Sequence, residues 1–258
     1  GWLIGQALLT QGAKVVLTAT RHPEELEARL RDATGLGAAE RCLTVVGDVR
    51  DPKSCEQVVA ATLERFGRID VLMNNAGRGT GEYRMSMTEP VPFYEIPIDG
   101  WRTIIDTNVN GTYFMTRAVM PHMLERDFGK IVNFSTSLTT MVGRGLSGYG
   151  ASKAAIETAT VVWAKELADS GVDVNVLLPG GASDTDFITQ TMVPGKVGER
   201  SALLPADVIV PPALWLASDL SNGVSGRRLI GKFWDHDKSV DDAVAACMVA
   251  SHESPRIM

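Results

Sequence analysis

A tyrosine and a lysine stand four positions apart in the stretch Tyr149-Gly150-Ala151-Ser152-Lys153. Residues at this spacing lie on one face of a helix, so the Lys153 ammonium can lie beside the Tyr149 phenol. A phenol has a pKa of about 10 and is a poor acid–base catalyst at neutral pH. A fixed neighbouring cation favours the phenolate, and we expect it to bring the pKa of Tyr149 towards the working range. An exposed tyrosine near a solvated lysine is the alternative interpretation.

Three hydroxyl side chains follow the apolar run 130–134. They belong to Ser135, Thr136 and Ser137. In a parallel sheet the carboxyl end of a strand borders the crevice that binds ligands. One of these hydroxyls could therefore hydrogen-bond to a carbonyl or alcohol oxygen of a substrate, although a turn rich in serine and threonine has the same composition.

Two further apolar runs, 42–47 and 69–73, end in residues that suit a flat polar ligand. Asp48 could accept a hydrogen bond from an adenine amino group while Val49 packs against the ring. The segment 74–77 (Asn-Asn-Ala-Gly) combines small and amide side chains, which would let the backbone approach a cofactor. Asparagine and glycine after a strand are also common turn residues.

Two other positions suggest a specific role. Asn108 lies inside an apolar segment that is expected to be helical, where asparagine is unfavourable, so we expect it to have a particular hydrogen-bond partner. Pro179-Gly180-Gly181 ends the last long apolar run and predicts a flexible loop that faces a ligand.

The elements that must position these residues alternate along the chain. Short β-branched runs predict strands, and their near-continuous apolar character is typical of a parallel sheet buried on both faces. The sequence therefore predicts one α/β domain, a doubly wound Rossmann-type fold with a mostly parallel sheet. The expected strands are 14–20, 42–47, 69–73, 130–134 and 172–178, and the expected helices are 2–10, 54–66, 99–125, 149–170 and a looser one at 206–218.

Several residues mark the expected helix ends. Asp51-Pro52 supplies an N-cap and a proline for the first turn. Gly67 and Gly171 are expected to end helices before the strands that follow them. Asp99 is expected to cap the long helix after it.

We interpret Gly1 as the last glycine of a phosphate-binding loop. A doubly wound nucleotide-binding domain begins with a strand, a glycine-rich turn and a helix, and residues 2–10 correspond to that helix. The first strand and part of the glycine-rich loop are then absent from this chain. Because that strand would be central, a gap is expected between its two neighbours. The alternative is that Gly1 is an arbitrary start with no loop before it.

Composition excludes several classes of function. The net charge of −6 and the pI of about 5.3 argue against binding to nucleic acid or to anionic lipid. No apolar run approaches the roughly 18 to 20 residues that span a membrane, and no signal-peptide pattern opens the chain. Three cysteines without metal-ligand spacing predict neither disulfides nor a metal site, so a cytoplasmic location is the simplest expectation.

In this order the motifs resemble those of the classical short-chain dehydrogenase/reductase family, over roughly residues 1–230. The resemblance implies a nicotinamide cofactor and hydride transfer to or from a substrate carbon. It implies that Tyr149 is the general acid in reduction and the base in oxidation, and that Lys153 lowers the Tyr149 pKa and holds the nicotinamide ribose. Asn108 would stabilise a bend in its helix and a proton-relay water near Lys153.

The resemblance also implies cofactor contacts, with Pro179, Gly180 and the backbone around Ala182 facing the nicotinamide amide and Thr185 reaching the phosphates. For the residue that holds the substrate oxygen, the alignment favours Thr136 and leaves Ser137 open. The expected cofactor-binding residues are Gly1, Thr20, Arg21, Asp48, Val49, Asn75, Ala76, Gly77, Tyr149, Lys153, Pro179, Gly180, Ala182 and Thr185.

The choice between cofactors depends on the end of strand 14–20. An acid there would accept the ribose hydroxyls and repel a 2′-phosphate. This chain has Thr20 and Arg21 and no acid at that point, which predicts NADP(H) rather than NAD(H). Arg21 as a solvated loop cation is the alternative.

The expected function is that of an NADP(H)-dependent oxidoreductase acting on a small-molecule ketone, aldehyde, quinone or 3-oxoacyl group, as a homodimer or homotetramer. A non-catalytic dinucleotide-binding regulator and a dehydratase or epimerase of the same family remain alternatives. Residues 1–235 are expected to form the domain and 236–258 a tail, which either crosses to another subunit or caps the fold. The apolar segment 78–100 is either a lid or a packed insertion. Substrate and physiological direction have no readable signal.

Overall fold

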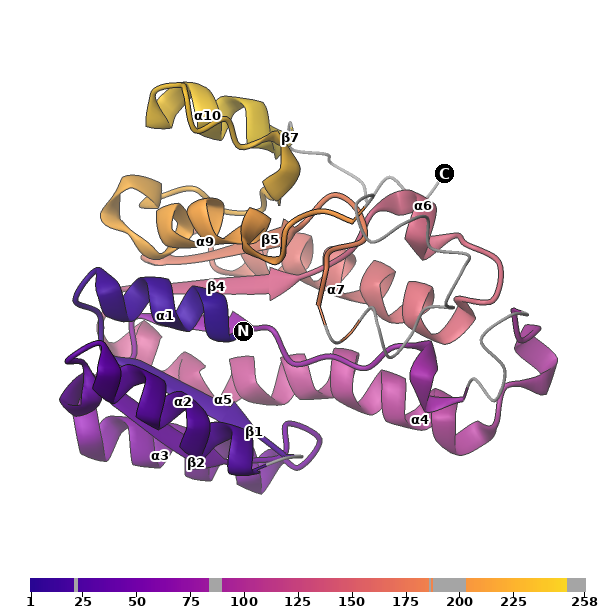
Figure 1. Ribbon diagram of the computed structural model, residues 1–258, viewed down its shortest axis with the longest axis horizontal. Helices are drawn as coiled ribbons and strands as arrows, with labels where there is room; N and C mark the ends of the chain where they lie inside the picture. Colours follow the sequence, from indigo (N-terminus) through magenta and orange to yellow (C-terminus); the bar gives the residue numbers. More distant parts are fainter. Residues whose placement is uncertain (21–22, 84–89, 186, 188–202, 250–258) are drawn as a thin grey trace.

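The computed structural model describes residues 1–258 except 21–22, 84–89, 186, 188–202 and 250–258. Its strands form a largely parallel sheet in two parts, as Figure 1 shows. One part has the order β1-β2, and the other has the order β3-β4-β5-β6-β7, in which only β7 is antiparallel to its neighbour. The strands are β1 (Val15–Ala19), β2 (Cys42–Val46), β3 (Val71–Asn74), β4 (Gly129–Phe134), β5 (Val172–Leu178), β6 (Arg228–Ile230) and β7 (Met248–Val249).

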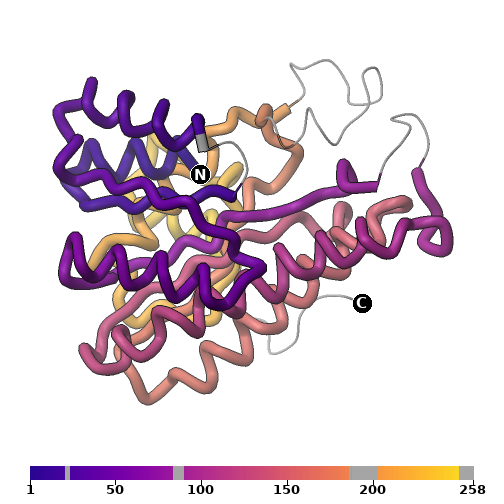
Figure 2. Tube along the Cα trace, turned by 90° about the horizontal axis from the view of Figure 1, so that it is seen from below, coloured from indigo at the N-terminus to yellow at the C-terminus, as the bar shows by residue number. Residues whose placement is uncertain are grey.

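Helices connect and cover these strands; α4 and α5 follow one another along the chain, and α7 packs against α4 and the turn between α4 and α5, as can be followed in Figure 2. None of the described helices has both the length and the apolar character needed to cross a membrane. The α-helices are α1 (Trp2–Thr10), α2 (Pro23–Gly35), α3 (Pro52–Phe66), α4 (Ile98–Ile105), α5 (Gly111–Glu125), α6 (Leu138–Met141), α7 (Ser147–Glu166), α9 (Val210–Ala217) and α10 (Val240–Cys247).

Strands β4 and β5 are the centre of the core, because every residue of both is buried. Their side chains alternate between two apolar clusters, as expected for a sheet covered on both faces. Ile131 and Val174 pack with residues of α3 and α5. Val132 and Leu177 pack with residues of α1 and α9 on the other face. The buried parallel sheet that the apolar runs predicted is therefore present.

The sheet is interrupted between β1 and β3, which belong to different sheets. This is the kind of gap that the sequence analysis expected at the position of a strand before Gly1. Strands β1 and β2 instead share a small apolar cluster with α1 and α2, which includes Leu9, Val15, Ala33 and Cys42. The first two strands are thus attached to the rest of the molecule by packing and not by a continuous ladder of hydrogen bonds.

Some helix ends agree with the sequence and others do not. Asp51 accepts a hydrogen bond from the Lys53 amide at 3.0 Å and caps α3, and Gly67 ends that helix with φ of 78°. Gly171 does not end a helix, because α7 stops at Glu166; a side chain at Gly171 would come within 1.9 Å of a backbone oxygen. Asp99 is not a cap either, since it lies in the first turn of α4.

The expected helix 99–125 is divided by a π-helical turn, Asp106–Asn110, between α4 and α5. Helix α2 was not anticipated as an element, whereas α10 agrees with the alternative that the tail forms a helix capping the fold. Val244 of α10 joins the core cluster beneath α9, and β7 pairs with β6, so residues 240–249 pack on the same sheet as the rest of the chain.

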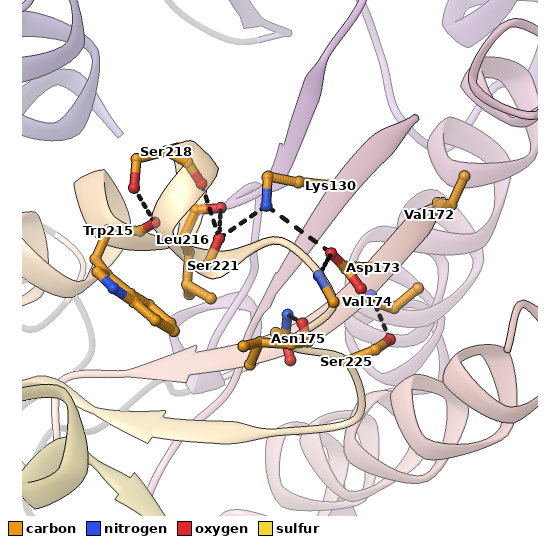
Figure 3. A network of polar contacts seen from close by, with 12 residues as sticks. Lys130, Val172, Asp173, Val174, Asn175, Trp215, Leu216, Ser218, Ser221 and Ser225 are labelled. Carbon is orange, nitrogen blue, oxygen red and sulfur yellow. Dashed lines mark hydrogen bonds and ion pairs between the residues drawn. The ribbon is translucent and has the colours of Figure 1, made fainter. Parts of the chain in front are cut away.

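A buried polar network fixes the loop that leads into β6, as Figure 3 shows. The Lys130 ammonium donates to the Ser221 hydroxyl at 2.8 Å and lies 3.8 Å from the Asp173 carboxylate. Asp173 in turn accepts from the Gly223 amide at 2.9 Å. Asn175 accepts from the Arg227 amide at 3.0 Å, so the start of β6 is held in register with β5.

Candidate active site

A cleft of about 720 Å³ runs along the carboxyl ends of the strands. This is the edge at which doubly wound sheets bind their ligands. Of the residues predicted for a site, those that line the cleft are Gly1, Thr20, Asp48, Val49, Asn75, Ala76, Gly77, Thr136, Tyr149, Lys153, Pro179, Ala182 and Thr185. Asn108, Ser137 and Gly180 do not line it, and Arg21 lies outside the described residues.

Tyr149 and Lys153 share one face of α7, as their spacing predicted. The Lys153 ammonium lies 5.7 Å from the centroid of the Tyr149 ring. It donates a hydrogen bond to the Phe134 carbonyl at 2.8 Å, at the end of β4. The ring of Phe187 also lies near the phenol, with 5.8 Å between the centroids of the Phe187 and Tyr149 rings. The phenol is therefore held between the sheet edge and an aromatic wall.

The pKa of the phenol differs from the expectation. Burial raises the pKa of Tyr149 to about 12, and a hydrogen bond from the Thr136 side chain opposes this only in part. Burial also lowers the pKa of Lys153 to about 8. The predicted lowering of the Tyr149 pKa by Lys153 is therefore not found: burial is the largest influence on the phenol, and only the Thr136 hydrogen bond acts against it. At neutral pH the phenol is protonated.

The two candidates for the residue that holds the substrate oxygen lie in different surroundings. Thr136 lines the cleft and its side chain hydrogen-bonds to Tyr149. Ser137 is instead the N-cap of α6, where its hydroxyl accepts from the Thr140 amide at 3.3 Å. A capping serine is oriented towards its own helix, so only Thr136 presents its hydroxyl beside the phenol.

Asn108 is buried behind the cleft, in the π-helical turn. Its Oδ1 accepts from the Arg78 amide at 2.7 Å, and its Nδ2 donates to the Arg78 carbonyl and to Ser152 Oγ, both at 2.9 Å. The amide group thus joins the segment after β3 to the start of α7. Sequence reasoning anticipated a specific partner, and the structure gives it three hydrogen bonds.

The opposite end of the cleft contains charged residues that sequence reasoning missed. Arg50 holds the Asp48 carboxylate through a side-chain contact of 2.6 Å, and this bond keeps the pKa of Asp48 below its usual value. The Thr20 hydroxyl donates to the Gly47 carbonyl at 2.7 Å. Arg50 and Glu25 also line the cleft. Arg50 follows Asp48 and Val49 closely in the sequence, but a single charged loop residue gave no signal of its own. Glu25 is brought to this edge only by the fold.

Two buried hydroxyl groups show that the cleft suits a polar ligand. Thr107 Oγ1 and Ser183 Oγ have no hydrogen-bond partner among the described residues, and both residues line the cleft. Buried hydroxyls without partners are rare and costly. A dinucleotide has hydroxyl, amide and phosphate groups that could serve them, so the residues present fit such a cofactor.

Gly180 has a structural reason for being glycine. Its φ is +93°, and a side chain there would come within 2.5 Å of Ile230. The residue forms the turn after β5 that places Pro179, Ala182 and Ser183 on the cleft wall. The glycine therefore acts on the cleft through the path of the backbone.

The segment 78–100 is described in part. Tyr83 is buried, and its hydroxyl donates to the Gly145 carbonyl at 3.4 Å. Phe93 and Tyr94 are 72% and 73% exposed and do not line the cleft. Met85 and Met87, which suggested a lid, lie outside the described residues. The described part of this segment thus packs mainly beside the cleft and not across it.

Comparison with known proteins identifies the family. The family model for short chain dehydrogenases matches residues 1–192. The NADP-dependent 3-hydroxy acid dehydrogenase YdfG of Salmonella typhi is 32% identical over 223 residues, which cover 84% of both proteins. The 3-oxoacyl-(acyl-carrier-protein) reductase FabG of Thermotoga maritima is 31% identical over 237 residues, 87% of this chain and 89% of that protein.

A solved structure shows the same fold. A gluconate 5-dehydrogenase from Burkholderia cenocepacia J2315, crystallised with NADP and tartrate, gives a TM-score of 0.74 at 23% identity and covers 89% of each chain. The chain belongs to the short chain dehydrogenase family. It is an NAD(P)-dependent oxidoreductase with a Rossmann-type fold.

Proposed function

We propose that this enzyme is an NADP(H)-dependent reductase that converts a carbonyl group to an alcohol, with Tyr149 as the proton donor. The observation that carries the proposal is the juxtaposition of the Tyr149 phenol, the Thr136 side chain and the Lys153 ammonium on one wall of the cleft. A phenol with a raised pKa is protonated at neutral pH and is suited to donate. Reduction is therefore the direction that this site favours.

Each residue has a distinct role in the proposed reaction. A nicotinamide, when bound, supplies the hydride that adds to the carbonyl carbon. The Thr136 hydroxyl donates a hydrogen bond to the carbonyl oxygen and orients it. Tyr149 transfers its proton to the same oxygen as negative charge develops there. The Lys153 ammonium stabilises the resulting phenolate and holds the ribose of the cofactor, while Asn108 holds the backbone at Arg78 against Ser152 of α7.

The cofactor preference rests on the polar end of the cleft. Thr20 lies there at the end of β1, and the guanidinium of Arg50 lines the wall nearby, which favours a 2′-phosphate. YdfG is named as NADP-dependent, and the gluconate 5-dehydrogenase was solved with NADP. Besides Asp48, Glu25 is the one acidic residue on this wall within the described part of the chain, and it lies in the first turn of α2. We expect kcat/KM with NADPH to exceed that with NADH at least tenfold; equal values would overturn the preference.

The substrate that we propose is a 3-oxo acid or a thioester of one. The two relatives named above act on a 3-hydroxy acid and on a 3-oxoacyl group. In this chain the exposed guanidinium of Arg144 lines the cleft on the Tyr149 side and has no ion-pair partner among the described residues. An unpaired guanidinium at this place can bind a carboxylate or a thioester oxygen.

Substitution of the phenol tests the catalytic assignment. Tyr149→Phe keeps the ring and removes the proton, and we expect kcat for reduction of a 3-oxo acid to fall about 10²- to 10⁴-fold. NADPH absorbance gives the rate, and quenching of protein fluorescence by NADPH shows whether the cofactor still binds. Retention of full activity would overturn the proposal and would favour a regulator that binds the dinucleotide without turnover.

We also propose that the enzyme is a homodimer or homotetramer formed through α4, α5 and α7. Helix α7 packs against α4 and the π-helical turn, and α4, α5 and α7 expose Trp101, Tyr113 and Val162, at 38%, 48% and 44%. Large apolar side chains that stay exposed are candidates for an interface. Light scattering of the wild type and of Tyr113→Glu tests this, and a monomeric wild type would contradict it.

A further inference from the structure

Three polar side chains meet behind the wall of the active site. The Glu157 carboxylate accepts a hydrogen bond from Ser135 Oγ at 2.7 Å and from Arg228 Nε at 2.9 Å. A second nitrogen of the same guanidinium, Nη2, donates to the Thr136 carbonyl at 3.0 Å. We call Ser135, Glu157 and Arg228 the anchor cluster. It connects directly to the peptide of the residue that we propose to hold the substrate oxygen.

Each member of the anchor cluster comes from a different element. Ser135 follows β4, Glu157 is one helical turn beyond Lys153 on α7, and Arg228 begins β6. The side chains of Glu157 and Arg228 are only 16% and 23% exposed. Charge-assisted hydrogen bonds with this degree of shielding are stronger than those of a surface ion pair. The cluster therefore ties the strand end to the catalytic helix at a fixed distance.

Two members of the anchor cluster, Glu157 and Arg228, lie outside the cleft, whereas Ser135 also lines it. Neither Glu157 nor Arg228 lines the cleft, so neither can touch substrate or cofactor there. Ser135 and Thr136 are consecutive, and the Ser135 hydroxyl is drawn to Glu157 while the Thr136 side chain reaches Tyr149. The Ser135 amide also continues the ladder of β4, donating to the Leu177 carbonyl at 3.0 Å. The anchor cluster therefore holds the Ser135 side chain and the Thr136 carbonyl together, which fixes the backbone from which the Thr136 side chain extends.

The position of Arg228 is itself determined by the sheet. Arg228 pairs in register with Val176 of β5, and the preceding Arg227 amide donates to Asn175 at 3.0 Å. This bond belongs to the same set of contacts that fixes the loop before β6 (Figure 3). The pairing of β6 with β5 thus places the Arg228 guanidinium next to the Thr136 carbonyl.

We propose that Glu157 and Arg228 are positioning residues that hold the Thr136 hydroxyl in line with Tyr149 and the substrate oxygen. This rests on the proposed function, because it assigns Thr136 to the substrate oxygen. A displacement of about 1 Å at a reacting centre lowers a rate by up to about a hundredfold. Loss of the anchor cluster should therefore lower kcat while leaving the binding of NADPH unchanged.

A double-mutant cycle tests the proposal. Arg228→Met should lower kcat for reduction about ten- to a hundredfold with the KM for NADPH unchanged. In the background of Thr136→Val, which has no hydroxyl to position, the same substitution should change kcat less than about twofold. A merely structural role would lower kcat by the same factor in both backgrounds, and that result would overturn the proposal.

The neighbouring arginine provides a matched control. The Arg227 side chain makes no hydrogen bond or ion pair among the described residues, so Arg227→Met should keep the wild-type kcat. Glu157→Gln keeps the size of the side chain and weakens both of its bonds, and it replaces Arg228→Met in the cycle if that variant does not fold. Thr136→Val with wild-type kcat would remove the basis of both this inference and the role of Thr136. In that case a loss of activity in Tyr149→Phe would still support the assignment of Tyr149 as the proton donor.

The pH profile gives a second readout. The hydrogen bond from Thr136 lowers the pKa of Tyr149 against the effect of burial. In Arg228→Met, Thr136 is held less firmly, so the rise of kcat/KM for alcohol oxidation with pH should move to higher pH. Thr136→Val should shift the same profile in the same direction. An unchanged profile in Arg228→Met, together with a shifted one in Thr136→Val, would contradict positioning.

Discussion

At the scale of single residues, the proposed role of Tyr149 predicts how the rate of each direction depends on pH. Its phenol is enclosed by Phe187 and the strand end and has a pKa of about 12. A group with a raised pKa stays protonated through neutral pH, so it can donate a proton but is rarely available to accept one. The same burial that favours reduction should oppose oxidation at pH 7.

This asymmetry predicts different pH dependences for the two directions. Below the pKa of Tyr149 the phenolate fraction rises about tenfold per pH unit, so kcat/KM for alcohol oxidation should rise about a hundredfold from pH 6 to pH 8. Reduction uses the protonated phenol and should change less than about threefold over this range. Initial rates in both directions at constant ionic strength measure this. An oxidation rate that is already level below pH 7 would show that the working pKa of Tyr149 is far lower.

Arg144 is the second residue with a separable effect. Because its guanidinium is exposed at the cleft and unpaired among the described residues, Arg144→Leu should raise the KM for a 3-oxo acid about tenfold or more. The KM for the neutral methyl ester should change little, since an ester has no full charge to bind. Steady-state kinetics with the acid and ester pair separate the two cases. Equal changes for both substrates would exclude a carboxylate contact.

At the scale of elements, the short helix α6 is packed against the start of α7 without room for a side chain. Met141 is the last residue of α6, and a Cβ at Gly150 would come within 1.9 Å of its carbonyl oxygen. At Gly148, on the same helix, the nearest atom would be 3.4 Å away, on Trp101. The close approach of α6 brings Thr136 and Tyr149 to the same wall.

These two glycines form a matched pair for mutation. Gly150→Ala must push α6 away, and overpacking of this kind typically destabilises by about 1–3 kcal/mol. We expect a lower melting temperature together with a loss of activity. Gly148→Ala has ordinary contacts and gains helix propensity, so it should be neutral or slightly stabilising. Thermal unfolding of both variants measures the difference, and equal melting temperatures would contradict the packing argument.

The sequence predicted those elements whose apolar pattern or helix caps are local. The buried strands β4 and β5 and the capped helix α3 are within a residue or two of their expected bounds. Helix α2 was missed because its charged sequence has no clear apolar stripe. Gly171 was misinterpreted as a helix end. A glycine is needed there because the Asp127 backbone packs against it in space, although Asp127 is distant in the sequence.

The difference between local patterns and distant contacts also explains which parts of the site could be predicted from the sequence. Tyr149, Lys153 and the hydroxyls after β4 belong to short motifs, so their approximate place could be predicted. Arg228 reaches Thr136 across 92 positions of sequence, and no local pattern announces such a contact. The pKa of Tyr149 was predicted in the wrong direction because a sequence shows the neighbouring charge but not the burial. Contacts between residues distant in the sequence, and the loss of hydration that they cause, can be predicted only from the structure.

At the scale of the whole molecule, the sheet consists of two pieces with no strand pairing between β1 and β3. A two-stranded sheet has little independent stability, whereas β4 and β5 are buried throughout. We therefore expect amide hydrogens of β1 and β2 to exchange with solvent faster than those of β4 and β5. Hydrogen–deuterium exchange followed by mass spectrometry measures this, and equal protection of both pieces would show that packing alone makes the fold one cooperative unit.

The cleft crosses from one piece to the other, since its wall includes Thr20 and Asp48 on one side and Tyr149 and Lys153 on the other. NADPH bound along its length would therefore slow exchange in β1 and β2 more than in the rest of the chain. During gradual heating, the region that grips the adenosine should loosen first. Such a protein would lose its affinity for the coenzyme at temperatures where its catalytic half is still intact.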